Sequence, residues 1–383
     1  MKAEPKKVND AVKRANWGQA PWMIDFHAEE RALPDQVDFA IVGGGFSGLS
    51  AAAWLRHLEP RKSVAVFEAD SISSGHTGGM ALGETAAGDL PGLGDVLAGL
   101  QRILGELGVH CDLTLPGAFE IGRTESWDDS PISWNDSGHL RVTREVPGGT
   151  IDPGKMVTGL ARATLDGGGQ ICEHAPVEEI RNEHTPKLQV RGKTVHAKCV
   201  LIATNAESLE LSGLQGGAQP KFTLAVATDP LTQEQINLLG LGSGKPFYTV
   251  DLPYLWGRVL YGSRVIFGSG LVHLNDWHEL LTLDVSQGEA AALLSDLEKR
   301  VHNLHPVLRN VRLGHRWGGP ILIADKWQPV FMRHPSNQNA IVLGAYSGHG
   351  VAQSVYLGAW AAEVMLGKRD LPKWDPEQGP TQK

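Results

Sequence analysis

A continuous apolar run that ends in three glycines is the feature that most constrains the fold of this 383-residue chain. The run, FAIVGGG at residues 39–45, shows no polar alternation, which is typical of a strand buried on both faces of a parallel sheet. A helix is expected to follow over residues 46–58, and SVAVFE at residues 63–68 is predicted to form a second buried strand. Together these elements predict a β-α-β unit of about 30 residues.

The glycines of the turn have the spacing of a dinucleotide-binding fingerprint, Gly43-x-Gly45-x-x-Gly48. Gly43 permits the tight turn, Gly45 lets the backbone approach a pyrophosphate, and Gly48 allows the helix to pack closely on the strand. Glu68, at the end of the second strand, is placed to accept hydrogen bonds from an adenosine ribose. The pattern predicts a nucleotide cofactor but does not distinguish NAD from FAD. The alternative is a glycine-rich turn that serves packing alone.

Composition argues against several other classes of protein. Lys and Arg number 35 against 43 Asp and Glu, a formal net charge of −8, so we expect no nucleic-acid partner. The three cysteines, Cys111, Cys172 and Cys199, are far apart, which favours reduced thiols over disulfides or a zinc site. His302 and His305 lack further ligands in a metal-binding pattern, so we expect no metal. Without a signal sequence or a membrane span, we expect a cytoplasmic protein.

Two kinds of pattern alternate along the chain, which indicates two domains whose segments are not contiguous. Helices are expected at residues 95–107, after Asp152-Pro153, at 287–302 and at 352–366, and a buried strand at 340–346. Between about residues 220 and 310 the predicted strands are longer and carry aromatic side chains. The nucleotide-binding pattern therefore occupies the beginning and the end of the chain.

Five motifs occur in order along the chain: GGGFSGLSAA, SSGHTGGMA, PVEEI, ATNA and the C-terminal set HRWGGP, ADKWQP and GAYSGHGVAQS. In this combination the chain resembles the D-amino acid oxidase superfamily of FAD-dependent amine oxidoreductases over roughly residues 36–366. The RWGGP variant is similar to the branch of gamma-glutamylputrescine oxidase, near the glycine and sarcosine oxidases. The resemblance therefore implies FAD as the cofactor.

The expected fold class is α/β, or α+β overall: a Rossmann-like FAD-binding domain and a second, mostly antiparallel-sheet substrate domain, interleaved in sequence. We expect an N-terminal arm lying on the body of the protein and a short C-terminal tail. The expected segments are 1–35 for the arm, 36–85, 150–222 and 310–368 for the FAD-binding domain, 86–149 and 223–309 for the substrate domain, and 369–383 for the tail.

The resemblance also implies which residues contact FAD. The first glycine turn and Glu68 would hold the ADP half, the main chain of Val177 would pair with adenine, and residues 74–80 would wrap the pyrophosphate and the edge of the isoalloxazine ring. The turn at 347–351 would place amides and a helix N-terminus at the flavin N1/C2 carbonyl, where negative charge accumulates on reduction. The expected contacts are Gly43, Gly45, Phe46, Ser47, Gly48, Glu68, Ala69, Gly75, His76, Thr77, Gly78, Gly79, Met80, Val177, Ala203, Thr204, Asn205, Ser347, Gly348, His349, Gly350, Val351 and Ala352.

Four residues are expected to take part in the reaction itself: Arg316, Tyr254, Trp256 and His349. Arg316 occupies the position where members of the superfamily commonly carry an arginine for a substrate carboxylate. Tyr254 and Trp256 fall on one strand face by the period of two and are predicted to form an aromatic wall, with a core or interface role as the alternative. For Arg258 we favour a surface ion pair over substrate binding.

The resemblance implies that a C–N bond of an amine or amino acid is oxidised by hydride transfer to flavin N5, and that the imine product is hydrolysed. Oxygen is the expected electron acceptor; a dehydrogenase that reduces a quinone or a protein, and a subunit with structural FAD, are the alternatives. No cysteine lies in the C-terminal flavin segment, so noncovalent FAD is expected, and His76 is interpreted as a hydrogen-bonding residue in preference to a covalent attachment point. Ala352 replaces an anchoring lysine, which favours a bulkier or less acidic amine than glycine. An oligomer is possible.

Overall fold

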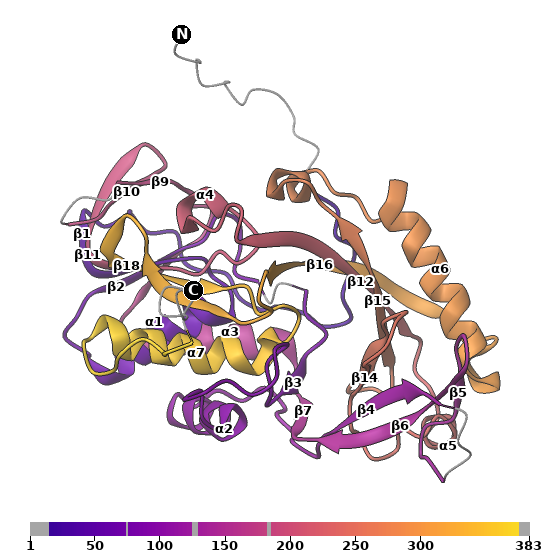
Figure 1. Cartoon of the computed structure of the whole chain (residues 1–383). Helices are drawn as coiled ribbons and strands as arrows, with labels where there is room; N and C mark the ends of the chain where they lie inside the picture. The colour runs from indigo at the N-terminus through magenta and orange to yellow at the C-terminus, as the bar shows by residue number, and fades with distance from the viewer. Residues whose placement is uncertain (1–14, 74–75, 125–128, 182–184, 375–383) are drawn as a thin grey trace, which may run out of the picture.

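The computed structural model describes residues 15–73, 76–124, 129–181 and 185–374, and the structural statements below concern these residues. Two eight-stranded sheets lie next to each other (Figure 1). A short ribbon formed by β3 (Met80–Leu82) and β7 (Gly148–Thr150) lies near the point where the two halves meet.

The first sheet has five parallel strands at its centre, in the order β18–β11–β1–β2–β8. β17 pairs antiparallel with β18, and the hairpin β9–β10 extends from β11. The expected β-α-β unit is confirmed, and α1 has the expected bounds, Phe46–Leu58. The strand bounds are Gln36–Val42 (β1), Val64–Phe67 (β2), Gln170–Cys172 (β8), Val177–Arg181 (β9), Lys187–Val190 (β10), Lys193–Ile202 (β11), Val330–His334 (β17) and Asn337–Gly344 (β18).

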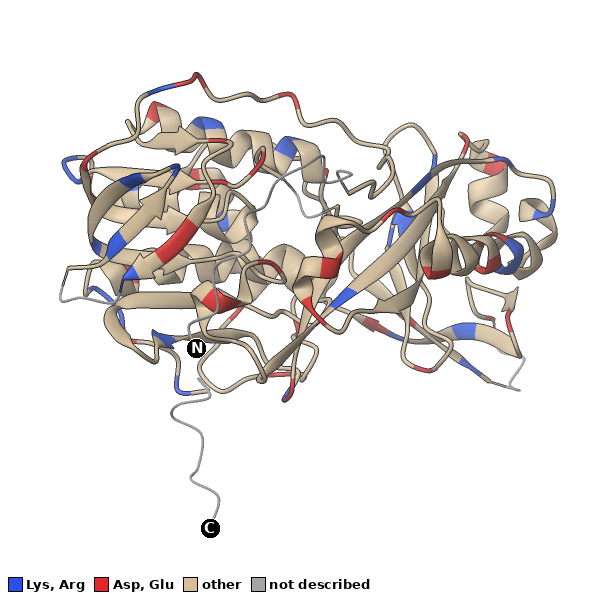
Figure 2. Cartoon of the chain, turned by 90° about the horizontal axis from the view of Figure 1, so that it is seen from above, with Lys and Arg blue, Asp and Glu red and all other residues tan. Residues whose placement is uncertain are grey.

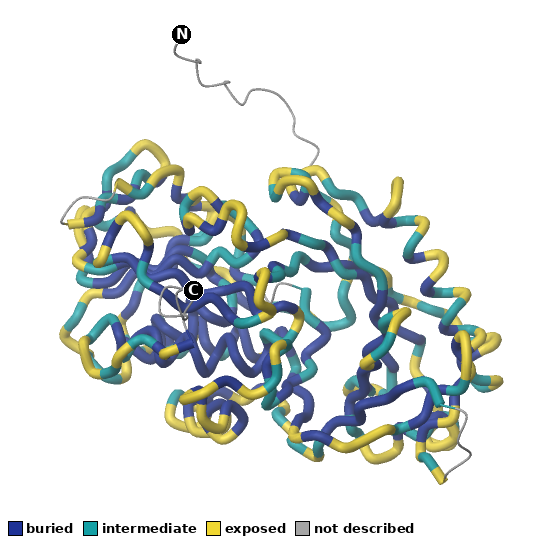
Figure 3. Tube along the Cα trace, in the orientation of Figure 1, coloured by how far each residue is buried: buried dark blue, intermediate teal, exposed yellow. Residues whose placement is uncertain are grey.

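Alternate residues of β1 enter two different cores, as a strand buried on both faces requires. Phe39 and Ile41 pack with α1, α3 (Pro153–Asp166) and α7 (Gly350–Met365), and α2 (Val96–Glu106) packs against α7. Ala40 and Val42 pack in the other core, together with β10 and α4 (Leu209–Ser212). The tube view shows this buried centre of the first sheet and its helices (Figure 3).

The second sheet is antiparallel except for the pair β13–β4, in the order β16–β12–β15–β14–β13–β4–β6–β5. α6 (Gly288–Leu304) packs on β12 and β15 and covers one face (Figure 1). Residues of β12, β14, β15 and β16 on the other face form a third apolar cluster together with Leu82 of β3. The strand bounds are Ala118–Arg123 (β4), Trp134–Asn135 (β5), His139–Val146 (β6), Ala218–Thr228 (β12), Phe247–Thr249 (β13), Trp256–Val259 (β14), Val265–His273 (β15) and Leu313–Ala324 (β16).

The remaining elements are short and lie in the connections of the second sheet. α5 (Gln233–Leu238) begins with a complete capping box, in which Thr232 and Gln235 satisfy each other's backbone amides. Two single-turn helices flank α6, η1 (Trp277–Leu281) before it and η2 (Pro306–Leu308) after it.

The expected fold class is confirmed: a parallel nucleotide-binding type of sheet with a mostly antiparallel second sheet. The helices expected at 95–107, after Asp152-Pro153, at 287–302 and at 352–366 correspond to α2, α3, α6 and α7. Two segments lie in another part of the fold than their expected domain. α2 packs on the helices of the first sheet, whereas β16 belongs to the second sheet.

Charged residues of both signs occur on both halves of the molecule (Figure 2). None of the helices in the described ranges combines the length and hydrophobicity that crossing a bilayer would need. Among these residues, no three or more His, Cys, Asp or Glu side chains come together as a metal site.

Candidate functional site

The turn between β1 and α1 allows a ligand to approach the backbone closely. Gly43 has φ of +107°, a conformation that favours glycine, and its amide donates to the Phe67 carbonyl oxygen at 2.9 Å. A Cβ on Gly48 would overlap the carbonyl oxygen of Gly43, so α1 reaches the turn only with glycine at this position. Gly45 is the N-cap of α1 and has no side chain to cap the helix. The amides of the first turn, including those of Phe46 and Ser47, therefore suit a pyrophosphate.

The carboxylate of Glu68 lies beside this turn. It accepts hydrogen bonds from the backbone amides of Gly44 at 2.7 Å and Asp70 at 2.9 Å. Burial raises the pKa of Glu68, and the amide donors act against that rise. The pKa of nearby Glu207 is raised to about 7, first by burial and then by repulsion from Glu68 and Asp70. Oxygen acceptors with little access to water suit hydroxyl donors such as those of a ribose.

Two turns that are far apart in sequence meet at the carboxyl ends of β11 and β18. Asn205 has φ of +51°, and its Oδ1 accepts a hydrogen bond from the amide of Ala345 at 3.0 Å. Thr204 Oγ1 is buried and has no hydrogen-bond partner among the described residues. The hydroxyl of Ser347 accepts from the amide of Ala324 at 3.3 Å, so this turn also contacts β16 of the second sheet. The site therefore lies where the two sheets meet.

α7 begins in the same turn, with His349 as its N-cap and Gly350, Val351 and Ala352 in its first turn. The Nδ1 atom of His349 is buried without a partner in the described structure, and burial lowers the pKa of this imidazole. Gln353 donates from Nε2 to the Glu84 carbonyl at 3.1 Å, while its Oε1 is also buried and unpaired among these residues. The amino end of this helix carries a positive partial charge, which suits the flavin carbonyl expected here.

The loop expected at the flavin edge contacts the second sheet directly. His76 has φ of +56°, and its Nδ1 is buried without a described partner. Burial lowers the pKa of His76, so its imidazole is neutral near pH 7. The Gly78 carbonyl accepts a hydrogen bond from Arg258 Nε at 2.5 Å, and a Cβ on Gly78 would overlap the Trp256 ring. Ser74 and Gly75 lie outside the described residues.

Trp256 and Arg258 lie on the same face of β14, and both contact Gly78 of the loop expected at the flavin edge. Both are buried: Arg258 is 4% exposed, its Nη2 has no hydrogen-bond partner among the described residues, and burial lowers its pKa to about 10. The expectation that Arg258 forms a surface ion pair is therefore wrong. The sequence carries a signal for the true position of Arg258. Alternate residues of a strand share one face, so the spacing that joins Tyr254 to Trp256 also places Arg258 on that face.

Tyr254 precedes β14 and packs against the same apolar cluster as Trp256. Burial raises the pKa of its phenol to about 12, so this side chain is uncharged. Tyr248, on β13, also belongs to the cluster; its hydroxyl donates to Glu84 at 2.8 Å, and its ring lies 6.5 Å from that of His349. Aromatic side chains thus join the second sheet to the turn that begins α7.

The structure does not bring Arg316 to these residues. Arg316 pairs with Val226 across β16 and β12, on the face that α6 covers, and its guanidinium donates from Nη2 to Glu298 of α6 at 2.8 Å. The Arg316 side chain is 60% exposed. The next residue, Trp317, is 1% exposed and takes the other face, where its indole Nε1 donates to the His76 carbonyl at 3.0 Å.

The other expected cofactor contacts form one connected set. A Cβ on Gly43 would lie 2.7 Å from the Ala203 carbonyl oxygen, the hydroxyl groups of Ser47 and Tyr346 are 2.6 Å apart, and the Ser73 amide donates to the Gly44 carbonyl at 3.4 Å. Val177 opens β9 at the edge of the first sheet. The structure thereby brings described residues of the other four sets of motifs together at the loops of the first sheet and the facing strands of the second, whereas PVEEI leads into the edge strand β9. Of the remaining expected contacts, Ala69, Thr77, Gly79 and Gly348 lie in the connecting loops, and Met80 begins β3.

Buried polar atoms without hydrogen-bond partners provide a further test of whether these residues fit FAD. Buried polar groups in proteins are normally hydrogen-bonded. Within the described ranges, five of the buried side-chain atoms without a partner lie in the segments discussed above, which points to a polar ligand at this place. They are His76 Nδ1, Thr204 Oγ1, Arg258 Nη2, His349 Nδ1 and Gln353 Oε1.

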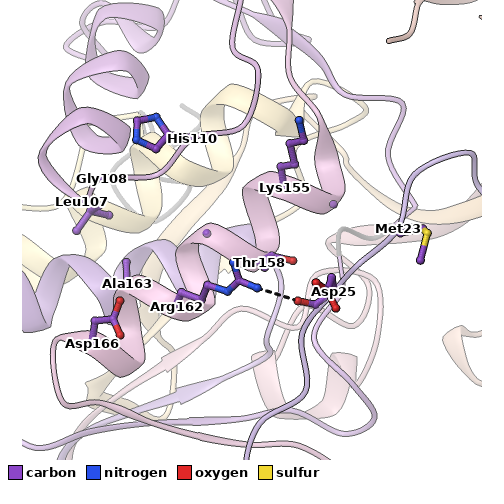
Figure 4. Close-up of a pocket in the computed structure, with 12 residues that line it drawn as sticks. Met23, Asp25, Leu107, Gly108, His110, Lys155, Thr158, Arg162, Ala163 and Asp166 are labelled. Carbon is purple, nitrogen blue, oxygen red and sulfur yellow. Dashed lines mark hydrogen bonds between the residues drawn. The ribbon is translucent and has the colours of Figure 1, made fainter. Parts of the chain in front are cut away.

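A separate pocket of about 420 Å³ opens between α3, the end of α2 and the N-terminal arm (Figure 4). Its two cations are already engaged: Lys155 donates to Asp112 at 2.7 Å, and Arg162 donates to the Asp25 carbonyl at 3.3 Å. None of its lining residues belongs to the expected cofactor contacts. We therefore do not assign the flavin or the substrate to this pocket.

The fold and the connected loops are of the nucleotide-binding type. Residues 38–364 match the family model described as FAD dependent oxidoreductase, and the chain belongs to this family. It is therefore an FAD-dependent oxidoreductase.

Several individual proteins are similar to this chain at sequence identities of 25% or less. Gamma-glutamylputrescine oxidoreductase from Escherichia coli is 25% identical over 394 residues, which cover 88% of this chain and 85% of that protein. The crystal structure of glycine oxidase from Geobacillus kaustophilus superposes with a TM-score of 0.71 at 19% identity, covering 91% of this chain and 99% of that one. L-proline dehydrogenase from P. horikoshii superposes with a TM-score of 0.69 at 18% identity, covering 91% and 100%. The structural matches establish the fold.

Proposed function

We propose that this protein oxidises a C–N bond of an amine or amino acid. The observation that carries the proposal is Arg258, a buried guanidinium that contacts Gly78 at the expected flavin edge and keeps Nη2 unpaired among the described residues. An unpaired, desolvated guanidinium nitrogen beside an indole suits a substrate that carries a carboxylate together with an apolar part. The names of the three similar proteins support this class, since two of them name an amino acid and the third names a putrescine derivative.

The side chains of this chain have distinct proposed roles. FAD, when bound, supplies the acceptor for the hydride that leaves the substrate carbon. Arg258 binds the substrate carboxylate, and Trp256 and Tyr254 orient the amine and exclude water. His349 and the amino end of α7 stabilise negative charge at the flavin carbonyl. No side-chain base is required, because the amine binds in its neutral form and the imine product is hydrolysed by water.

We propose oxygen as the electron acceptor, with support from the similarity to glycine oxidase. The similarity to L-proline dehydrogenase supports the alternative, in which a quinone or a protein takes the electrons. A subunit with structural FAD is the second alternative. The unpaired Arg258 argues against it, since a structural cofactor alone does not require an unsatisfied cation on the substrate side.

We propose that FAD is held without a covalent bond. Cys111 and Cys172 are buried, and Cys199 is partly buried on β11. Burial raises the thiol pKa of Cys111 to about 12 and that of Cys199 to about 11, so both are unreactive thiols at neutral pH. Free thiols also support a reducing compartment such as the cytoplasm.

An anaerobic absorption spectrum tests these proposals. The purified protein is recorded before and after addition of amines and amino acids, and air is then admitted. We expect an oxidised-flavin spectrum that bleaches with a carboxylate-bearing amine and recovers in air with formation of peroxide. Recovery only with an artificial acceptor would establish the dehydrogenase alternative, and no bleaching with any amine would favour structural FAD. Acid precipitation should release the flavin into the supernatant if the bond is noncovalent.

A further inference from the structure

The N-terminal arm is fixed across both sheets. Its Trp17 carbonyl accepts a hydrogen bond from the Gly318 amide at 2.9 Å, and its Gln19 amide donates to the Arg316 carbonyl at 3.0 Å, so the arm pairs with β16. Further along, the Ala28 amide donates to the Glu173 carboxylate, beyond β8 of the first sheet, at 2.8 Å. In Figure 1 the indigo arm begins beside η1 and passes toward the first sheet.

Two tryptophans of the arm support His76, which lies in the loop expected at the flavin edge. Trp17 contacts His76 directly, and Trp22 acts through Trp317. The Trp17 ring meets the His76 ring edge to face, with centroids 5.5 Å apart. The Trp22 ring meets Trp317 in the same way at 5.6 Å, and Trp317 Nε1 donates to the His76 carbonyl at 3.0 Å. His76 is therefore held at its ring by Trp17 and at its backbone by Trp317, which Trp22 supports.

Trp17 is itself held on several sides. Its indole Nε1 donates to the Leu280 carbonyl at 3.2 Å, and its ring lies 5.7 Å from that of Phe222 on β12. The arm residue between Trp17 and Gln19 is Gly18, with φ of +82°, where a Cβ would overlap the Arg316 carbonyl oxygen. A rigid indole is thus presented to His76 by the second sheet and by η1.

His76 needs this support because its own backbone does not favour the observed conformation. A φ of +56° is costly for a residue with a Cβ, and the glycines at 78 and 79 leave the next part of the loop without side chains to anchor it. The ring is also desolvated, and its Nδ1 stays unpaired among the described residues. Burial lowers the pKa of His76, so a neutral ring presents one N–H and one acceptor nitrogen.

We propose that the arm is part of the cofactor site, and that Trp17 is a positioning residue that holds His76 with its free ring nitrogen toward bound FAD. The inference rests on FAD lying beside the loop at 76–80 and not on the identity of the amine. It assigns the arm a role in cofactor binding, and it predicts that Trp17 acts through His76.

The test is FAD affinity and the visible spectrum of bound flavin, measured by titrating apoprotein with FAD. Trp17→Ala should weaken FAD binding about tenfold and shift the flavin absorption bands, because the loss of an aromatic contact releases His76. Trp17→Phe, which keeps an aromatic edge, should stay within about threefold of wild type. Tyr261→Ala is the control, since Tyr261 is an aromatic residue that is 95% exposed, lies in the turn after β14 and belongs to none of the motifs. It should leave affinity and spectrum unchanged.

A double-mutant cycle separates positioning from general stability. In a His76→Ala background, Trp17→Ala should change FAD affinity by less than about twofold, because its partner is already absent. An equal loss in both backgrounds would overturn the proposal. If Trp17→Ala does not fold, Trp17→Leu, which keeps apolar bulk without a ring edge, carries the same expectation. If the wild type and Trp17→Ala bind FAD equally well, the role of the arm is overturned but the cofactor assignment stands. If the wild type does not bind FAD, the cofactor assignment is overturned as well.

Discussion

Arg258 and Arg316 lie on opposite faces of one sheet, so the two arginines serve different parts of the molecule. Arg258 is 4% exposed and donates to the carbonyl of Gly78 at 2.5 Å, at the contact between the sheets. Arg316 lies on the face covered by α6 and is bonded to Glu298. The same residue type is therefore a buried cation in one place and a surface ion pair in the other.

This relationship predicts unequal effects of two matched substitutions. Arg258→Met should lower kcat/KM for the reactive amine by about a hundredfold, because a charge-assisted hydrogen bond to substrate contributes about 2–3 kcal/mol. Arg316→Met should change kcat/KM by less than about threefold, since exposed ion pairs contribute little. Steady-state kinetics on the substrate found by the spectral screen provides the measurement. A larger loss of kcat/KM in Arg316→Met than in Arg258→Met would show that Arg316, and not Arg258, binds the substrate carboxylate.

Gly48→Ala should disrupt the first turn. The added Cβ would overlap the carbonyl oxygen of Gly43, so we expect a loss of about 1–3 kcal/mol of stability and weaker FAD binding. The control is Gly105→Ala in α2, where a Cβ meets no described atom within 4 Å. That change should stabilise the protein by about 0.5–1 kcal/mol. Urea unfolding and FAD titration measure both, and a neutral Gly48→Ala variant would contradict the close packing.

The ionisation of Asp38 should make the free energy of unfolding depend on pH in the acid range. Burial raises the pKa of this carboxyl, but Lys198 at 2.7 Å and the amide and hydroxyl of Ser63 outweigh burial and bring the pKa to about 2. Because the folded pKa lies below the unfolded value of 3.8, the stabilisation is present above pH 4 and is lost as pH falls toward 2.

Asp38→Asn tests that sign. The variant should be less stable than wild type by about 2 kcal/mol at pH 7, and the difference should shrink as the pH falls below 4. Asp89→Asn provides a comparison, as Asp89 has no ion pair with a described residue. Denaturant unfolding between pH 2 and 7 gives both curves. A difference that grows on acidification would show that the ion pair does not account for the shift.

Asp136 should be important for stability and for the position of Tyr254. Its buried carboxylate accepts hydrogen bonds from Arg123 at 2.7 Å and from Arg300 at 2.5 and 3.0 Å. Arg300 also donates to the Tyr254 carbonyl at 2.7 Å, so the network holds the segment that leads into β14. Asp136→Asn should cost about 3–5 kcal/mol, because it leaves two buried cations undercompensated. Asp296→Asn, which removes an exposed pair on α6, should cost less than about 1 kcal/mol in the same unfolding experiment.

The sequence determined the first sheet and the glycine turn because their signals are local. A buried strand, Gly43-x-Gly45-x-x-Gly48 and the acid after the next strand each depend on neighbouring residues and a short-range pattern. The family resemblance implied FAD, and the family match over residues 38–364 agrees with that cofactor, while the contacts of FAD with these loops stay a prediction.

The tertiary structure alone decided which cations and aromatic rings reach the site. Successive residues of a strand point to opposite faces, so only one of the neighbours Arg316 and Trp317 can point toward the site. Which one does so depends on which face of β16 turns toward the first sheet. That choice is made by pairing with β12 and by α6, which are far away in the sequence. The contact between Trp17 and His76 likewise joins residues with no shared local pattern. Only the packing of the arm across both sheets brings them together.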